Sequence, residues 1–436
     1  EEQFRLPQEQ AAERNTAALA APALPPDAPV ALAPVPSPTR LILRRGLRHT
    51  GFLIGAGILG LIVLAALLQV TPLGVLGLAL ALVAGGARAE DGDEAPPAVS
   101  SVPELPVRSV RLIPTALSVV PGVLLHGVGP LAAGDVLLSK RLFILEGAGL
   151  GILAAGVVPI AYTGASRHVI GPLYGVALTG GGIFFISMLA NLYAAVSPAF
   201  APGVPALQLP PVEVELGYQH VSDLSFAYRH FASLGVRARL DRLRLEAGAF
   251  WAPGGDNLRV RAGGAWRLLG APEGARGAGT EGTALDVEAA LLVHRFLAER
   301  FTLGGGEFFF RGRYDFARLG APLAGSFAEL GAGLAAQRYV YPDFEDDRLA
   351  QQLLYTFGFG VYLGRGGPFR GEALLFYDHR KDDFAGGLKG GAGVPGYLGL
   401  RLRTLLAGPW GASAEVHAGS ALVGRVALIY AWGGDT

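Results

Sequence analysis

The chain has 436 residues, of which 51% are hydrophobic and 17% are charged, and its mean hydropathy is +0.39. Soluble domains carry about 25% charged residues, so this composition excludes an ordinary soluble enzyme and indicates a membrane protein. The 36 basic and 36 acidic residues cancel, which leaves no basic field to attract nucleic acid, and the lack of cysteine excludes disulfides, thiolate catalysis and cysteine-bound metals.

Residues 1–89 divide into a tether and an apolar segment. Residues 1–48 are rich in Ala and Pro and predict a disordered tether. A cationic patch (RLILRRGLRH) leads into the hydrophobic segment 49–89, where Gly51–Val70 carries no charge and has the length of a membrane span. A positive flank, an apolar stretch and a final small-x-small pattern are also typical of a secretory signal. Two interpretations stay open: a retained helical hairpin, or a targeting segment cut after Ala89.

A second hydrophobic region follows the acidic and Pro-rich linker of residues 90–115. Residues 116–199 predict a Gly-rich helical region, in which Leu142–Tyr162 and Val169–Val196 are long enough to span a membrane. Glycines recur four residues apart, a spacing that lets apolar helices approach closely. These pairs are Gly51 and Gly55, Gly147 and Gly151, and Gly171 and Gly175.

Three ionisable residues, His126, Asp135 and Glu146, lie within this apolar region. An ionisable side chain inside a membrane is a candidate for proton or ion coupling. Each of the three also lies near an expected helix end or break, from which it can reach the membrane interface. The sequence leaves both interpretations open.

The pattern changes after the Pro-rich linker of residues 200–211. Residues 212–436 repeat segments of about ten residues in which apolar and polar side chains alternate. In one such segment, Leu243 and Leu245 alternate with Arg244 and Glu246. Alternation over many segments predicts a transmembrane β-barrel with one face toward lipid and the other toward a polar lumen. A soluble β-sandwich also alternates, but its dry core rarely takes charges at successive inward positions.

Aromatic residues and connection lengths support this interpretation. Aromatic side chains stand near the ends of the apolar rows, where an interfacial girdle lies. They are Trp251, Trp266, Tyr377 and Trp432. Short connections are expected on one side of a barrel and longer loops on the other. The short ones are Asp241-Arg242, Gly364–Pro368 and Ala407–Gly411, and the longer ones are Ala252–Asn257, Tyr341–Arg348 and His379–Gly396.

Residues 212–436 therefore resemble the bacterial outer-membrane β-barrel class. The resemblance implies an antiparallel transmembrane barrel of about twelve strands, with ten to fourteen compatible with the pattern, in the bacterial outer membrane. Such barrels usually finish on an aromatic residue, whereas here Trp432 is followed by GGDT. An inner-membrane helical protein with a soluble β domain is the alternative without a barrel.

The polar rows carry charges of both signs, which we expect to pair across a narrow lumen and fill it. A wide diffusion channel needs more strands. The expected lumen cations are Arg237, Arg239, Arg259, Arg261, Arg311, Arg313, Arg370, Arg401, Arg403 and Arg425. The expected lumen anions are Glu213, Glu215, Glu246, Asp286, Glu288, Glu307, Glu329, Glu372 and Glu415.

The length of the 200–211 linker restricts where the helices lie. Fully extended, it reaches about 40 Å, which is far less than the width of a periplasm. The helices of residues 116–199 must therefore sit in or against the same membrane as the barrel. There they pack on the barrel wall or on copies of themselves.

Two clusters carry weak candidates for chemistry. Ser413, Glu415 and His417 alternate on one strand, with Ser420 following, and a Ser–His pair with an acidic partner is the arrangement of an acyl hydrolase. Neighbours two apart on a strand are about 7 Å apart, which is too far for a direct Ser–His bond. Ordinary lumen polarity is thus the competing interpretation.

The second cluster, Tyr377–Asp383 (YDHRKDD), is either a solvated loop or a site for a cation or lipopolysaccharide phosphates. The sequence contains no phosphate loop, dinucleotide fingerprint, zinc spacing or calcium loop, and predicts no catalytic, cofactor or metal site.

Three functions remain. The first is a structural outer-membrane protein that anchors an envelope-associated assembly, with partners in the lipid bilayer, lipopolysaccharide, other envelope proteins or copies of itself through the glycine-lined helices. The second is a lipid-modifying enzyme that resembles acyl hydrolases. The third is a small channel or transporter.

Overall fold

The computed structural model describes twelve stretches of the chain. They are residues 111–164, 169–197, 209–222, 229–254, 257–273, 282–297, 300–341, 349–364, 370–379, 396–406, 408–419 and 421–433. The predicted tether 1–48, the segment 49–89 and most of the linker 90–115 lie outside these residues, as do residues 200–208 and Ser420.

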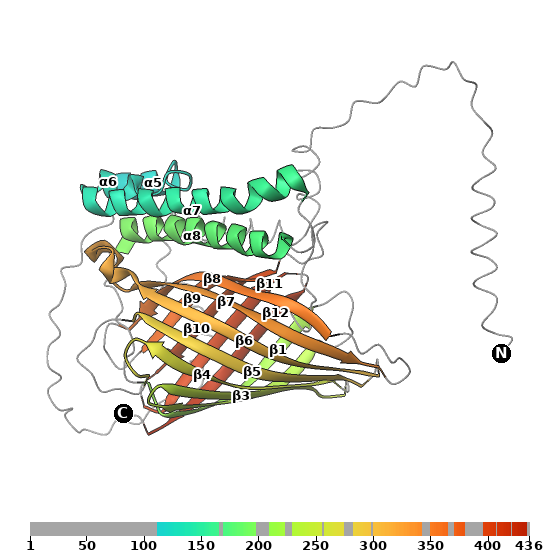
Figure 1. The fold of residues 1–436 in the computed structure, drawn as a ribbon. Coiled ribbons are helices and arrows are strands. Elements are labelled where there is room, and N and C mark those ends of the chain that lie inside the picture. Colours follow the sequence, from blue (N-terminus) through green and yellow to red (C-terminus); the bar gives the residue numbers. More distant parts are fainter. Residues whose placement is uncertain are drawn as a thin grey trace, which may run out of the picture. The chain divides into compact units, whose positions relative to one another are not determined.

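Within the described residues, four helices precede the strands (Figure 1). They are α5 (Leu112–Val119), α6 (Val128–Ala132), α7 (Val136–Thr163) and α8 (Ile170–Val196). Helices α7 and α8 are both long and apolar enough to cross a membrane. Helix α7 begins six residues before the predicted span Leu142–Tyr162, whereas α8 matches the predicted span Val169–Val196 to within one residue. Between α5 and α7, the chain forms a series of turns over residues 120–127, followed by the short helix α6.

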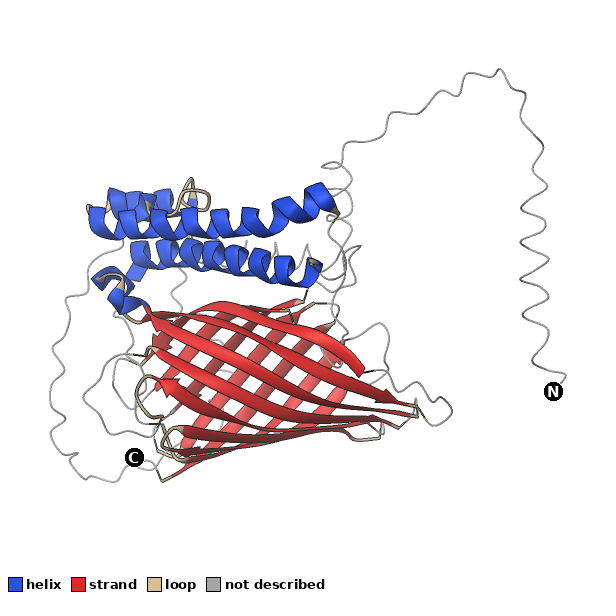
Figure 2. Ribbon diagram, viewed as in Figure 1, coloured by secondary structure: helices blue, strands red, loops and turns tan. Residues whose placement is uncertain are grey.

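The strands form a closed antiparallel barrel (Figure 2), which confirms the predicted fold and strand number. They are β1 (Val212–Ser222), β2 (His230–Leu240), β3 (Leu243–Ala252), β4 (Asn257–Leu269), β5 (Ala284–Phe296), β6 (Phe301–Asp315), β7 (Ser326–Val340), β8 (Leu349–Leu363), β9 (Arg370–Asp378), β10 (Tyr397–Leu405), β11 (Trp410–Ala418) and β12 (Leu422–Trp432). Each strand pairs with its sequence neighbours, and β1 pairs with β12, from Val212 opposite Trp432 to Ser222 opposite Leu422. The twelve-strand sheet therefore has no free edge.

The two faces of the wall differ as the alternation predicts. The outward rows are apolar and exposed: Leu291 is 70% exposed and Leu334 is 66% exposed. The inward rows carry the charged side chains. Lipid is the environment that suits an exposed apolar band of this kind. Trp266 and Trp432 stand outward near one end of the barrel and Trp251 near the other, as interfacial girdles require.

We call the end where β1 begins and β12 ends the terminal end, and the opposite end the distal end. The three predicted short connections are terminal and the three predicted long loops are distal, as expected: 241–242, 364–368 and 407–411 on one side, and 252–257, 341–348 and 379–396 on the other. Connections that the sequence analysis did not name do not all follow this separation. The terminal end also carries the longer connections 270–283 and 316–325, while the distal connection 419–421 is short.

Helices α7 and α8 form a hairpin through close backbone contact. A Cβ atom on Gly180 would come within 2.1 Å of the Leu153 nitrogen, and one on Gly149 within 2.8 Å of the Phe184 nitrogen. The predicted pair Gly51 and Gly55 lies outside the described residues, and the predicted pairs within the described residues do not make this contact. A Cβ on Gly147 or Gly151 would meet nothing within 4 Å, and the same holds for Gly171.

Helix α8 packs on the outer face of β7 and β8. Phe185 contacts Phe357 edge-on at a ring separation of 5.7 Å, and the Tyr193 hydroxyl donates to the Ala324 carbonyl at 2.9 Å. Near the other end of α8, the Tyr174 ring lies 5.0 Å from His379. Because His379 is distal and Ala324 is terminal, α8 runs along the wall from one end of the barrel to the other.

Candidate functional site in the barrel lumen

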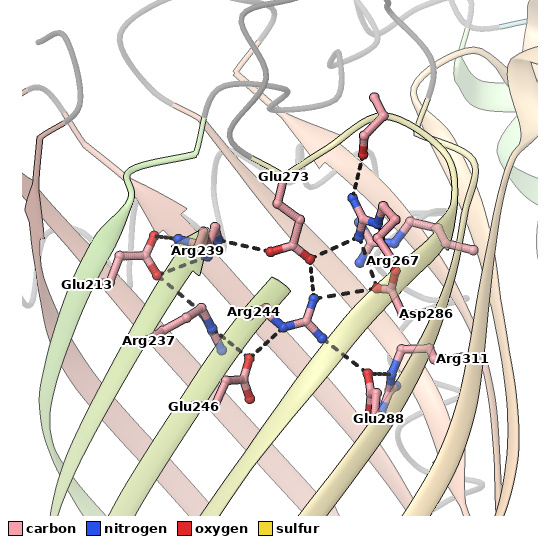
Figure 3. Close-up of polar contacts among 12 residues, drawn as sticks. Glu213, Arg237, Arg239, Arg244, Glu246, Arg267, Glu273, Asp286, Glu288 and Arg311 are labelled. Atoms are coloured by element: carbon pink, nitrogen blue, oxygen red, sulfur yellow. Dashed lines mark hydrogen bonds and ion pairs between the residues drawn. The ribbon is translucent and has the colours of Figure 1, made fainter. Parts of the chain in front are cut away.

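An ion-pair network lines the terminal half of the lumen (Figure 3). It arises because arginines and carboxylates occupy the inward positions of neighbouring strands, so that long side chains meet across and along the sheet. Members on β1, β2 and β3 connect with members on β4, β5 and β6. The structure therefore confirms that charges of both signs pair across the lumen.

Glu213 on β1 is the most deeply buried member of this network. Its side chain is 0% exposed and meets Arg239 at 3.1 Å and Arg237 at 3.3 Å. It also contacts Arg403 from β10. A carboxylate without access to water is stabilised only by such partners, so Glu213 joins β10 to β2 across β11, β12 and β1.

Glu273 reaches into the lumen from the connection between β4 and β5. It contacts Arg239 at 3.3 Å, Arg267 at 3.0 Å and also Arg244. Glu273, Arg244 and Arg267 are absent from the set of lumen residues expected from the sequence. Arg244 and Arg267 could have been included, since they alternate with Leu243 and Trp266, but no local pattern marks a loop glutamate as inward.

The network continues around the barrel as a chain of shared partners. Arg244 meets Glu288 at 3.1 Å, and Glu288 meets Arg311 at 2.9 Å. Arg313 then joins Glu329 at 2.5 Å to Glu372 at 2.7 Å. Most of these guanidinium groups bind two or more carboxylates, because the planar guanidinium carries several N–H donors that point in different directions.

The remaining predicted lumen residues also find partners, except that the side chain of Arg370 lies outside the described part. Arg261 pairs with Glu307 at 3.0 Å, and Arg425 with Glu215 at 3.3 Å. Arg259 lies over the Phe250 ring at 5.7 Å.

An apolar cluster narrows the distal half of the lumen. Its buried members are Val221, Phe231, Phe296, Ala421 and Val423. The Phe296 and Phe301 rings stack at 4.3 Å. Alternation of apolar and polar residues predicts a polar lumen, so these apolar residues inside the lumen were not expected.

A cavity of about 560 Å³ lies inside the lumen, and members of the ion-pair network such as Arg239, Glu273 and Glu288 form part of its walls. Its walls include Gln219, Phe250, Arg401, His417 and Arg425. The lumen is thus neither a wide open pore nor filled throughout.

The candidate catalytic residues on β11 face this cavity. His417 Nε2 lies 2.9 Å from Glu415 Oε1, and Arg401 also binds Glu415 at 2.8 Å. Ser413 lies four positions from His417 along the strand, a separation of about 13 Å. Ser420 lies outside the described residues, so a nucleophile with these partners remains a prediction.

The Tyr377–Asp383 cluster is described only as far as His379. The Tyr377 hydroxyl lies 2.9 Å from His379 Nδ1, and residues 380–383 fall outside the described part. A cation or lipopolysaccharide site there stays a prediction.

The structure brings together two of the three ionisable residues in the helical region. The His126 backbone N–H donates to Glu146 Oε2 at 2.8 Å, and both side chains are buried. Asn191 on α8 accepts from the Gly127 N–H at 3.1 Å and so fixes the same turn. Asp135 instead caps α7 by accepting from the Leu138 N–H at 2.9 Å. These contacts give the three residues a structural role in holding the turn before α7.

No family model and no curated protein matches this chain. Among solved structures, it is similar to the KdgM porin, with 11% identity and a TM-score of 0.31 over 51% of this chain and 99% of that one. It is also similar to the Acinetobacter baumannii outer membrane protein Omp33, with 9% identity and a TM-score of 0.28 over 52% and 100%. A third is the translocator domain of the autotransporter NalP from Neisseria meningitidis, with 12% identity and a TM-score of 0.28 over 57% and 96%.

The chain's own features decide its class. A closed twelve-strand sheet with an apolar exterior and a charged interior is the fold of an outer-membrane β-barrel. No particular family within that class is identified.

Proposed function

We propose that this protein is a structural barrel of the bacterial outer membrane that anchors an envelope-associated assembly. The observation that carries the proposal is the narrowed lumen. Ion pairs around Glu213 and Glu273 project into its terminal half, and the cluster around Phe231 projects into its distal half. A bore narrowed at both levels is poorly suited to free diffusion of large solutes.

The helices supply a surface for the assembly. Helix α7 contacts α8 on one side, while its other side exposes Leu137, Ile144 and Val158 at 60%, 61% and 48%. Lipid covers such side chains in a membrane, and so does an apolar helix of another envelope protein or of a second copy. Lipopolysaccharide is a further partner for the barrel exterior.

Purification in mild detergent, followed by planar-bilayer recording, tests this function. We expect a stoichiometric envelope partner to co-purify with the full chain, and expect no steady ion conductance. The matched control is a full chain with Leu137 and Ile144 changed to Ala, which should retain the barrel and lose the partner. A conducting barrel that purifies alone would contradict the proposal.

A small channel or transporter is the second candidate, because the cavity of about 560 Å³ has charged walls. Steady single-channel conductance would favour it. Ion selectivity that changes when Arg425 is replaced by Gln would place the conducting path through the cavity.

A further inference from the structure

Two histidines face outward from the barrel wall at the distal ends of β1 and β2. His220 on β1 stands directly opposite His230 on β2. Both belong to outward rows, since Leu216 and Tyr218 on the same row of β1 are 61% and 43% exposed. His230 is exposed and His220 is partly exposed. The outward rows are otherwise apolar, so contact with lipid does not account for a pair of imidazole rings.

The pair lies beyond the apolar band of the barrel. His220 is two residues before the end of β1, and His230 is the first residue of β2. Trp251, which stands outward near the distal end, pairs with Ala232, and His230 lies two residues beyond Ala232 toward that end. Water and lipid headgroups begin at an aromatic girdle. Ions in the aqueous phase can therefore reach both rings.

The strands hold the two rings at a separation that suits a shared metal ion. The Val221 N–H donates to the Arg229 carbonyl at 2.9 Å, so backbone pairing continues past the histidines. Their ring centroids lie 5.3 Å apart. A ring nitrogen binds zinc at about 2.0–2.1 Å, and an angle of about 90–110° at the metal then places two ring centroids about 4.5–5.2 Å apart. Small side-chain rotations therefore suffice for one nitrogen of each ring to reach the same ion.

The Tyr218 hydroxyl orients one of these rings. It lies 2.6 Å from His230 Nδ1, and the two rings stack at a centroid distance of 6.0 Å. A metal-binding histidine usually donates its second ring N–H to an acceptor, which fixes the ring and makes the other nitrogen a better ligand. When Nδ1 donates to the Tyr218 hydroxyl, Nε2 of His230 is the nitrogen left for the metal ion.

There is open space on the other side of His220. Gly424 on β12 stands opposite His220 there, and a Cβ atom on Gly424 would meet nothing within 4 Å. Within the part of the chain that the structure describes, no third histidine or carboxylate joins the pair. The space beside Gly424 has room for the water molecules that complete the coordination of an ion held by two histidines.

We propose that His220 and His230 bind one divalent transition-metal ion, and that Tyr218 positions His230 for it. Imidazole ligands suit zinc, copper and nickel, whereas calcium and magnesium prefer oxygen ligands. The ion links β1 to β2 on the outer wall and so stabilises the distal end of this strand pair. The site requires neither a pore nor a partner protein, and thus goes beyond the anchoring function.

Titration of the full chain in detergent with Cu²⁺, followed by electron paramagnetic resonance, tests the proposal on protein purified without a histidine tag. Cu²⁺ binds imidazole nitrogens in a tetragonal geometry, and its spectrum reports how many nitrogens are bound. We expect one ion per chain with coupling to two nitrogens. His220→Gln and His230→Gln should each abolish the two-nitrogen signal. Boiling-dependent gel mobility verifies that each variant forms the closed barrel.

Tyr218→Phe separates a positioning role from a ligand role. This variant should keep the two-nitrogen signal and weaken Cu²⁺ binding about tenfold, because it removes only the group that orients His230. Loss of the two-nitrogen signal, or unchanged affinity, would contradict the role given to Tyr218.

His379→Gln is the matched control. His379 is also a distal histidine whose Nδ1 meets a tyrosine hydroxyl, at 2.9 Å from Tyr377, but its ring contacts Tyr174 and Tyr377 and not a second histidine. The variant should bind Cu²⁺ as the wild type does. A two-nitrogen signal that persists in His220→Gln or His230→Gln, or an equal loss in His379→Gln, would overturn the proposal. Neither result depends on conductance or on a captured partner.

Discussion

Replacing Glu213 with Gln removes the most buried charge of the lumen network while keeping the shape of the side chain. Glu213 is 0% exposed and serves three arginines, at 3.1 Å for Arg239, at 3.3 Å for Arg237 and in direct contact for Arg403. Breaking a buried ion pair destabilises a protein by about 3–5 kcal/mol because a charge is left without compensation.

The loss should fall at the lower end of that range. Each arginine keeps a second carboxylate: Glu273 for Arg239, Glu246 for Arg237 and Glu215 for Arg403. The amide oxygen of Gln can still accept from one of them. We therefore expect the free energy of unfolding to fall by about 3 kcal/mol.

Urea titration of the barrel in lipid vesicles, followed by tryptophan fluorescence, measures this change. The control is Glu246→Gln, because Glu246 contacts Arg237 and Arg244 but its side chain is 34% exposed. Partial contact with water should limit its loss to about 1 kcal/mol. Equal losses for the two variants would refute the argument that burial, rather than the number of partners, sets the strength of these ion pairs.

Three further predictions concern the helices and the terminal end. Gly180→Val should separate α7 from α8, because a Cβ atom at position 180 has no room beside Leu153. Gly147→Val should leave the two helices in contact. Cysteine cross-linking between the helices measures the effect of each variant. Burial lowers the pKa of His379 below its ordinary value of 6.5, so protonation of His379 favours the unfolded form. The contact of α8 with the distal end should therefore be complete above pH 6.5 and weaken as the pH falls below 6.5. Hydrogen exchange of α8 should show this change in the wild type and not in His379→Gln. Glu273→Gln should loosen the terminal half of the lumen, since Glu273 holds three arginines, and raise ion leakage in planar bilayers without opening a pore of porin size.

The barrel could be predicted from the sequence because alternation of period two is a direct consequence of strand geometry in lipid. The same geometry assigned most lumen charges correctly, as Glu213 and Arg313 illustrate. It could not assign Glu273, because a loop has no period. It also could not foresee Phe231 and Phe296 inside the lumen, since an apolar residue on a polar row looks like an interruption of the pattern.

The helix contact was harder to predict for a related reason. Spacing of four marks Gly147 and Gly151 as one small face of α7, but spacing alone does not say which face meets a partner. The structure uses Gly149 and Gly156, which are seven apart and so also share a face, against Ala177 and Gly180 of α8. Where glycine is this common, several faces satisfy the same rule, and tertiary packing selects among them.

The position of α8 follows from the residues it covers. The outward row of β8 reads Tyr355, Phe357, Phe359 and Val361, and a row this apolar suits lipid and a helix equally well. Close packing favours the helix at this position. Gly182 lies directly over the Phe357 ring, where any larger residue would move the α8 backbone away from β8. The Tyr193 hydroxyl then finds an acceptor at the terminal rim instead of being buried without one. Because α8 extends from the distal to the terminal end of the wall, the helices and the barrel share one apolar band, and a single bilayer suffices for both.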